Sequence, residues 1–167
     1  DVYIENNLTL TIKGANDDIE LTGEPNKVIF NILDGDLDDC YIEITVNNLN
    51  FNGNDASSAI NADGVELLKI VDSKLENFAD SSINHEGVSG SEALVIENTE
   101  FLNNTTTGYS GGVIYVSDVS VSISGSYFCG NSSSTNGGAL GIKDASEINI
   151  TNTTFENNQA ASNGGAI

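Results

Sequence analysis

Apolar and polar residues alternate in five segments of the chain, and the two-residue period of this alternation is that of a β-strand. The segments are ITVNNLNFNGN (44–54), LKIVDSKLENF (68–78), LVIENTEFLNN (94–104), VSISGSYFCGN (121–131) and INITNTTFENN (148–158). In each segment one face is predicted to enter a core, and the residues between the apolar positions are mostly polar. No stretch shows helical spacing of apolar residues over a comparable length.

The five segments are copies of one repeat. Each is anchored by a large apolar residue: Phe51, Leu75, Phe101, Phe128 or Phe155. The anchors are 24, 26, 27 and 27 residues apart, and each is followed by a second phrase: SSAI (57–60), SSI (81–83), GGVI (111–114), GGAL (137–140) or GGAI (164–167). A unit of this length with several short strands predicts one coil of a parallel β-helix, so the expected fold class is all-β.

Polar and small residues recur at the expected bends between strands. Three residues after the anchor lie Asn54, Asn104, Asn131 and Asn158, with Phe78 at this position in the second copy. Stacked amides can bond to one another and to turn backbone, so we expect Asn ladders there. The glycine pairs are Gly111 and Gly112, Gly137 and Gly138, and Gly164 and Gly165. They are expected where the chain needs unusual dihedral angles or close backbone contact.

The domain organisation expected is a single β-helix. Residues 44–167 form its regular coils, and residues 1–43 form irregular leading coils with strands at 8–12, 19–21 and 27–33. The chain stops at Ile167 in the middle of a repeat. Because solenoids usually end in a cap, we expect a fragment of a longer protein.

The repeat resembles that of chlamydial-type polymorphic outer-membrane proteins. FNGN, FLNN, FCGN and FENN match the F-x-x-N motif of that family, and GGVI, GGAL and GGAI match its GGA[I/L/V] motif. The resemblance covers 44–167, with departures at LENF, SSAI and SSI. It implies a right-handed parallel β-helix displayed at the cell surface as an adhesin, like an autotransporter passenger. Similar repeats occur in adhesin-like proteins of gut methanogenic archaea.

Charge narrows the possible partners. The chain has five Lys, no Arg and 25 acidic residues, for a formal net charge of −20. Such a field repels nucleic acid and anionic lipid. No apolar run approaches the roughly 18–20 residues of a membrane span, so we expect neither nucleic-acid binding nor membrane insertion of this fragment.

Enzymatic chemistry has little support in the sequence, and no catalytic residue is predicted. Asp118 and Asp144 follow successive glycine pairs at equal spacing and could stack as a carboxylate pair, as a glycosidase needs. They also lie in expected turns, where Asp is ordinary. His85, the one histidine, is expected in a solvent-exposed loop.

Calcium is the one cofactor with a candidate site. Asp34, Asp36 and Asp38 have the one-three-five spacing of calcium loops. The sixth and twelfth positions, Asp39 and Thr45, depart from an EF-hand, so a solvated acidic turn is the alternative. No other cofactor is expected, and the two cysteines are expected to be free thiols.

The function expected is that of an adhesin-like, non-enzymatic protein that is extracellular or at the cell surface. Its partner would be a cell-surface protein or glycan receptor, bound through outer faces and the inter-coil loops, chiefly 79–92 and 104–110, whose length varies between copies. A carbohydrate-active β-helix enzyme, either a polysaccharide lyase or a glycoside hydrolase, is the first alternative. A passive structural stalk is the second.

Overall fold

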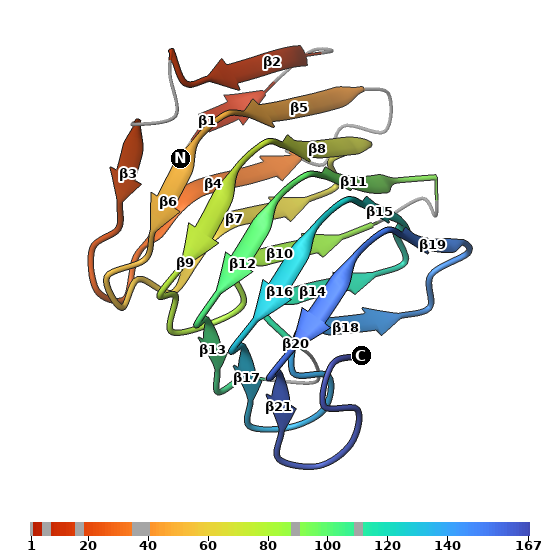
Figure 1. The fold of residues 1–167 in the computed structure, drawn as a ribbon. Coiled ribbons are helices and arrows are strands. Elements are labelled where there is room, and N and C mark those ends of the chain that lie inside the picture. Colours follow the sequence, from red (N-terminus) through yellow and green to blue (C-terminus); the bar gives the residue numbers. More distant parts are fainter. Residues whose placement is uncertain (1, 5–7, 16–18, 35–40, 88–90, 109–111) are drawn as a thin grey trace.

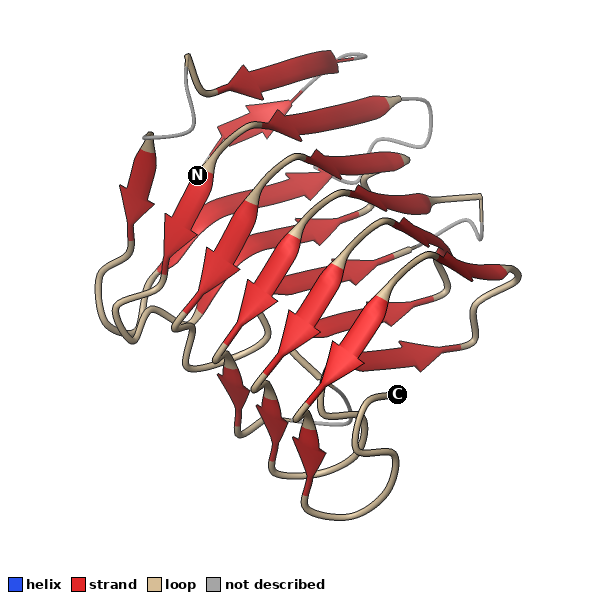
Figure 2. Cartoon of the chain, viewed as in Figure 1, coloured by secondary structure: helices blue, strands red, loops and turns tan. Residues whose placement is uncertain are grey.

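The computed structural model describes residues 2–4, 8–15, 19–34, 41–87, 91–108 and 112–167. Within these ranges the regular structure consists of strands and no helix (Figure 2). The strands pair in parallel and stack as a solenoid of about five turns (Figure 1). The predicted all-β parallel β-helix is confirmed.

Four parallel sheets run along the solenoid, and we name them A to D. Sheet A contains β1 (Val2–Ile4), β4 (Val28–Asp34), β7 (Ser58–Asp63), β10 (Ile83–Glu86), β14 (Ile114–Ser117) and β18 (Leu140–Lys143). Sheet B contains β2 (Leu8–Lys13), β5 (Ile42–Asn47), β8 (Leu67–Val71), β11 (Ala93–Glu97), β15 (Ser120–Ser124) and β19 (Ile148–Thr151). Sheet C contains β3 (Glu20–Thr22), β6 (Asn50–Asn52), β9 (Lys74–Glu76), β12 (Glu100–Leu102), β16 (Tyr127–Cys129) and β20 (Thr154–Glu156). Sheet D contains the short strands β13 (Thr105–Thr106), β17 (Ser132–Ser133) and β21 (Gln159–Ala160).

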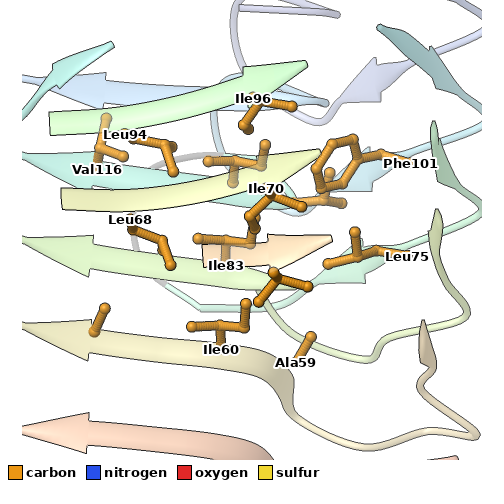
Figure 3. Close-up of a cluster of buried hydrophobic side chains, with 14 of the residues drawn as sticks. Ala59, Ile60, Leu68, Ile70, Leu75, Ile83, Leu94, Ile96, Phe101 and Val116 are labelled. Carbon is orange, nitrogen blue, oxygen red and sulfur yellow. The ribbon is translucent and has the colours of Figure 1, made fainter. Parts of the chain in front are cut away.

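Sheet B keeps the register that the repeat predicts. Ile70 is paired with Ile96, Ile96 with Ile123, and Ile123 with Ile150 on consecutive coils. The first three are buried, and Ile150 on the last strand is half-buried. Figure 3 shows Ile70 and Ile96 pointing into the same interior as Ile60 and Ile83 of sheet A. The core therefore lies between the sheets and continues along the solenoid.

Sheet C stacks the anchor residues. Phe51, Leu75, Phe101, Phe128 and Phe155 are in register on consecutive strands. The rings of Phe101 and Phe128 are stacked with centroids 4.6 Å apart, and those of Phe128 and Phe155 with centroids 4.9 Å apart. This spacing is close to the strand separation of a sheet, so the rings follow the backbone from coil to coil.

The first coil is built from the segment before residue 44. Strands β2, β3 and β4 pair in parallel with β5, β6 and β7, respectively. In this register Leu21 is paired with Phe51. Leu10 and Ile19 are 40% and 38% exposed. The apolar residues of β2 and β3 therefore contact the core from one side only, whereas β4 is paired with β1 on one side and with β7 on the other.

The corner between sheets B and C has a left-handed backbone in every regular coil. Its residues, three before the anchor, are Asn48, Asp72, Asn98, Gly125 and Asn152, with φ between 48° and 61°. Asn, Asp and Gly tolerate this region better than other residues. The left-handed backbone therefore explains why Asn, Asp and Gly occupy this corner.

Candidate functional site

A buried amide ladder joins the last three coils. Asn104 Nδ2 donates to Asn131 Oδ1 at 3.1 Å, and Asn131 Nδ2 donates to Asn158 Oδ1 at 3.0 Å. The same oxygens also accept bonds from the backbone N–H groups of Asn104 and Asn131. Asn104 and Asn131 are fully buried. The ladder therefore satisfies backbone at the corner between sheets C and D, and its role is structural.

The ladder ends at the second coil, which corrects the predicted position of Asn54. The backbone N–H of Phe78 donates to Asn104 Oδ1 at 3.1 Å, and the Phe78 side chain is buried. Ala79 N–H in turn bonds the carbonyl of Ala56, so Ala56 takes the equivalent place in the first regular coil. Asn54 lies at an exposed corner with φ of 47°. The extra residues in FNGNDA move it out of the column.

Close contact between coils explains the glycine pairs. A side chain on Gly112 would overlap the carbonyl oxygen of Ala139, and one on Gly138 would overlap that of Gly165. Gly137 and Gly164 also have φ of 57° and 62°. Gly112, Gly137 and Gly138 precede β14 and β18 and let the chain re-enter sheet A, and Gly164 repeats the conformation of Gly137 one coil later. Gly111 lies outside the described residues.

His85 is buried, which corrects its expected place in an exposed loop. It lies on β10 in register with Ala62 and Val116 and has no exposed surface. Its Nε2 is 2.8 Å from the carbonyl oxygen of Val65, so Nε2 carries the proton and donates it. Burial lowers the pKa of His85, although its bond to Val65 and the nearby Glu92 and Asp63 oppose the shift.

Asp118 and Asp144 follow paired strands, as their equal spacing predicts. Each has a left-handed backbone, and Asp118 N–H donates to the carbonyl of Lys143. Ser117 Oγ donates to Asp118 Oδ2 at 2.9 Å, and Lys143 Nζ lies 3.7 Å from Asp144 Oδ2. Both residues therefore form turns after strands of sheet A, and both side chains are exposed.

The predicted calcium ligands fall outside what the structure describes. Asp36 and Asp38 lie among residues 35–40, and of Asp34 only the backbone is described, at the end of β4. Among the described residues, no group of three or more His, Cys, Asp or Glu side chains could hold a metal ion. The calcium site stays a prediction.

The segments 79–92 and 104–110 are not simple loops, which corrects that expectation. Residues 83–86 form β10, and residues 105–106 form β13. Ser82, Asn104 and Thr106 are buried. Shortening either segment would therefore remove part of a sheet, so recognition by these segments must be tested by point substitutions.

Both segments border a groove on the outer face of sheet A. The groove has a volume of about 520 Å³, and its lining includes Asn61, Asp80, Asn84, Glu86 and Tyr115. Asp80 and Glu86 come from the first segment, and Gly108 of the second also lines it. The described part of the structure thus joins these two segments at one polar concavity.

Hydrogen bonds fix the polar side chains of this groove. Asp80 Oδ1 accepts bonds from Thr106 Oγ1 at 2.9 Å and from the backbone N–H of Ser81 at 2.8 Å. Asn84 Nδ2 donates to Asn61 Oδ1, and Asn61 Nδ2 donates to Asn31 Oδ1, both at 2.8 Å. The groove is therefore preorganised, since its amides and one carboxylate are held by neighbouring coils.

Another outward tyrosine lies outside this groove. Tyr127 on β16 donates from its hydroxyl to Glu156 Oε2 at 2.8 Å. Hydrogen bonds with Cys129 and with Glu156 raise the pKa of Tyr127. Its position on sheet C makes it a matched control for Tyr115.

Two segments of the last coils match a known repeat. Residues 125–143 and 152–167 match the family model of the Chlamydia polymorphic membrane protein repeat. These two segments, 35 of the 167 residues, are similar to polymorphic membrane protein repeats. The first segment contains FCGN and GGAL, and the second contains FENN and GGAI, so the resemblance predicted from these motifs is confirmed.

The family is one of surface proteins, located in the outer membrane or at the surface in Chlamydia. No curated protein and no solved structure matches the chain significantly. A helix long and apolar enough to span a membrane is not found among the described residues.

Sequence reasoning missed the outward column that runs through the groove. Asn31, Asn61, Asn84, Tyr115 and Gly141 are in register on five strands of sheet A. Four of these residues directly follow the last apolar residue of SSAI, SSI, GGVI or GGAL, as Asn61 follows Ile60. Asn31 follows Phe30, which is the equivalent residue in β4. Aligning one further residue after that phrase brings these positions together, but their mixed Asn, Tyr and Gly identities do not indicate that they form an outward column.

Proposed function

We propose that the chain is part of an adhesin-like surface protein that attaches its cell to a host or neighbouring cell. The groove on sheet A is proposed as the recognition site. The observation that carries the proposal is a preorganised polar groove on the outer face of sheet A, in a solenoid whose last coils match polymorphic membrane protein repeats. Rigid scaffolds commonly carry recognition at such places.

The enzyme alternative has weaker support. Asp118 and Asp144 are engaged at a corner by Ser117 and Lys143. Known members of the repeat family are surface proteins and not enzymes. We therefore propose binding without catalysis.

A cell-binding assay tests the proposal. Purified chain, labelled at its amino terminus, is expected to bind target cells saturably, and Asn84→Ala in the groove is expected to weaken that binding. Asn149→Ala is the matched control because Asn149 is an exposed strand residue of sheet B. Equal binding by both variants, or none by the unaltered chain, would refute the proposed site. Polysaccharide cleavage abolished by Asp118→Asn or Asp144→Asn would favour the enzyme.

A further inference from the structure

The outward amides of sheet A form an oriented row. Asn61 and Asn84 each donate an Nδ2–H group to the amide oxygen of the preceding coil. Asn84 Nδ2 also lies 3.4 Å from Glu86 Oε1. Each NH₂ group has two hydrogens, and each amide oxygen has two lone pairs. Both hydrogens of Asn84 Nδ2 are thereby engaged, so the capacity left to a ligand is the second Nδ2 hydrogen of Asn61 and the remaining lone pairs of the Asn61 and Asn84 amide oxygens.

Tyr115 continues this row with an aromatic ring. It is paired with Asn84 on one side and with Gly141 on the other. Because Gly141 has no side chain, it leaves the Tyr115 ring uncovered on that side. Tyr115 also lines a second hollow of about 490 Å³ that includes Gly141 and Ile142. The half-buried ring thus offers an apolar face between two concavities.

The charge of the groove selects against anions. Asp80 and Glu86 are the charged residues among its described lining, and no Lys is among them. Lys143 lines the second hollow, where its Nζ lies 3.7 Å from Asp144 Oδ2. The whole chain has a net charge of −20. A uronate, sialate or sulfate would meet repulsion in the groove with no cation to pair with. A hydroxyl group can instead donate to either carboxylate, and such bonds are short and strong.

We propose that the groove binds a linear, uncharged glycan lying along the solenoid axis, with hydroxyl groups on Asn61 and Asn84 and one sugar face on Tyr115. Sugar hydroxyls both donate and accept hydrogen bonds, as amides do. Successive coils are about 4.8 Å apart, close to the length of one sugar unit in an extended chain. This inference names the ligand class of the site in the proposed function and rests on that function.

Calorimetric titration of the purified chain tests the ligand class. The probes are uncharged oligomers of glucose, mannose and N-acetylglucosamine, with oligogalacturonate as the acidic counterpart. We expect at least one uncharged series to bind, with affinity that increases with length and levels off at about three units, the number of coils in the row. Oligogalacturonate should not bind. Affinity should change little with salt, because no charge pair forms.

Matched variants tie binding to the row. Tyr115→Ala is expected to weaken binding about fivefold, since a stacked ring contributes on the order of 1 kcal/mol. Tyr127→Ala, on sheet C, should leave it unchanged. Asn84→Ala provides a second test should Tyr115→Ala fail to fold, which thermal melting would show.

The outcomes separate this inference from the proposed function. Saturable cell binding that depends on Asn84, without binding of any uncharged oligomer, would overturn the glycan and leave the adhesin. Binding of oligolysine that Asn84→Ala weakens, without binding of any uncharged oligomer, would also overturn the glycan, in favour of a basic partner. Binding of an oligomer by the groove without binding to cells would support the glycan and overturn the adhesin.

Discussion

Phe128 lies between the rings of Phe101 and Phe155 and is fully buried. Phe128→Ala should lower the free energy of unfolding by about 3–5 kcal/mol, because a cavity remains between two coils. Urea denaturation measures the change. Phe155→Ala is the control and should cost less, since Phe155 is only partly buried. Equal effects of the two variants would contradict the packing described.

Asn131 contributes through hydrogen bonds and not through volume. Asn131→Ala leaves its buried partners without bonds, including the carbonyl of Phe101 that now accepts from Nδ2 at 3.0 Å. The expected loss is about 1–3 kcal/mol in the free energy of unfolding. Asn54→Ala should change it by less than about 0.5 kcal/mol, because Asn54 is exposed. Denaturation curves that rank the two in the opposite order would refute the ladder.

His85 makes stability depend on pH. Its pKa is lowered in the folded chain, so below about pH 6.5 the unfolded chain binds the proton more readily. Stability from this residue is present above that pH and is lost as the pH falls toward the lowered pKa. Melting temperatures between about pH 7.5 and 5 should decline more for the unaltered chain than for His85→Gln, whose side chain does not titrate. Parallel curves would mean that His85 does not couple to folding.

At the scale of one element, the corner between sheets B and C depends on the left-handed backbone of one residue. Asn98 has φ of 48°, and Gly125 occupies the same position one coil later. Asn98→Val should lower the free energy of unfolding by about 1–2 kcal/mol more than Asn98→Gly does, because a left-handed backbone is unfavourable for a β-branched residue. Chemical denaturation of the two variants gives the difference. A valine variant as stable as the glycine variant would rule out backbone conformation as the cause.

The sequence predicted best the strands whose inward residues are large. Alternation located β8, β11 and β15, and the anchors located sheet C, because one face of each must be apolar. Sheet D was not predicted, since its strands have two residues each and contain Ser, Thr, Gln and Ala. Strand β10 was taken for a loop because INHE places His85 at the inward position, where the pattern expects an aliphatic residue.

The candidate site could be predicted only in part. Segments of variable length directed attention to residues 79–92 and 104–110, and Asp80 and Gly108 do line the groove. The row of Asn61, Asn84 and Tyr115 depends on register between coils, which a mixed Asn and Tyr column does not reveal on its own. The partners that fix Asp80, such as Thr106, are distant in sequence and become visible only in the fold.

At the scale of the whole molecule, net charge opposes folding. The formal charge is −20, and the described ion pairs are Lys69–Glu97, Lys74–Glu76 and Lys143–Asp144. Compaction brings the unpaired carboxylates together, so added salt should stabilise the fold by screening their repulsion. We expect the melting temperature to rise between about 0.01 and 1 M NaCl, as the Debye length falls from about 30 to 3 Å. A melting temperature that falls over this range would show that attractive pairs dominate.

The ladders that join one coil to the next also determine how the molecule responds to tension. Their bonds run along the solenoid axis, and each coil of the regular region contacts only its neighbours. A pull on the two chain ends therefore loads the outermost coil first and peels it away before the next is strained. Each detached coil of 27 residues releases about 90 Å of slack. A tether built in this way lengthens stepwise under load and dissipates a sudden pull, instead of breaking at a single point.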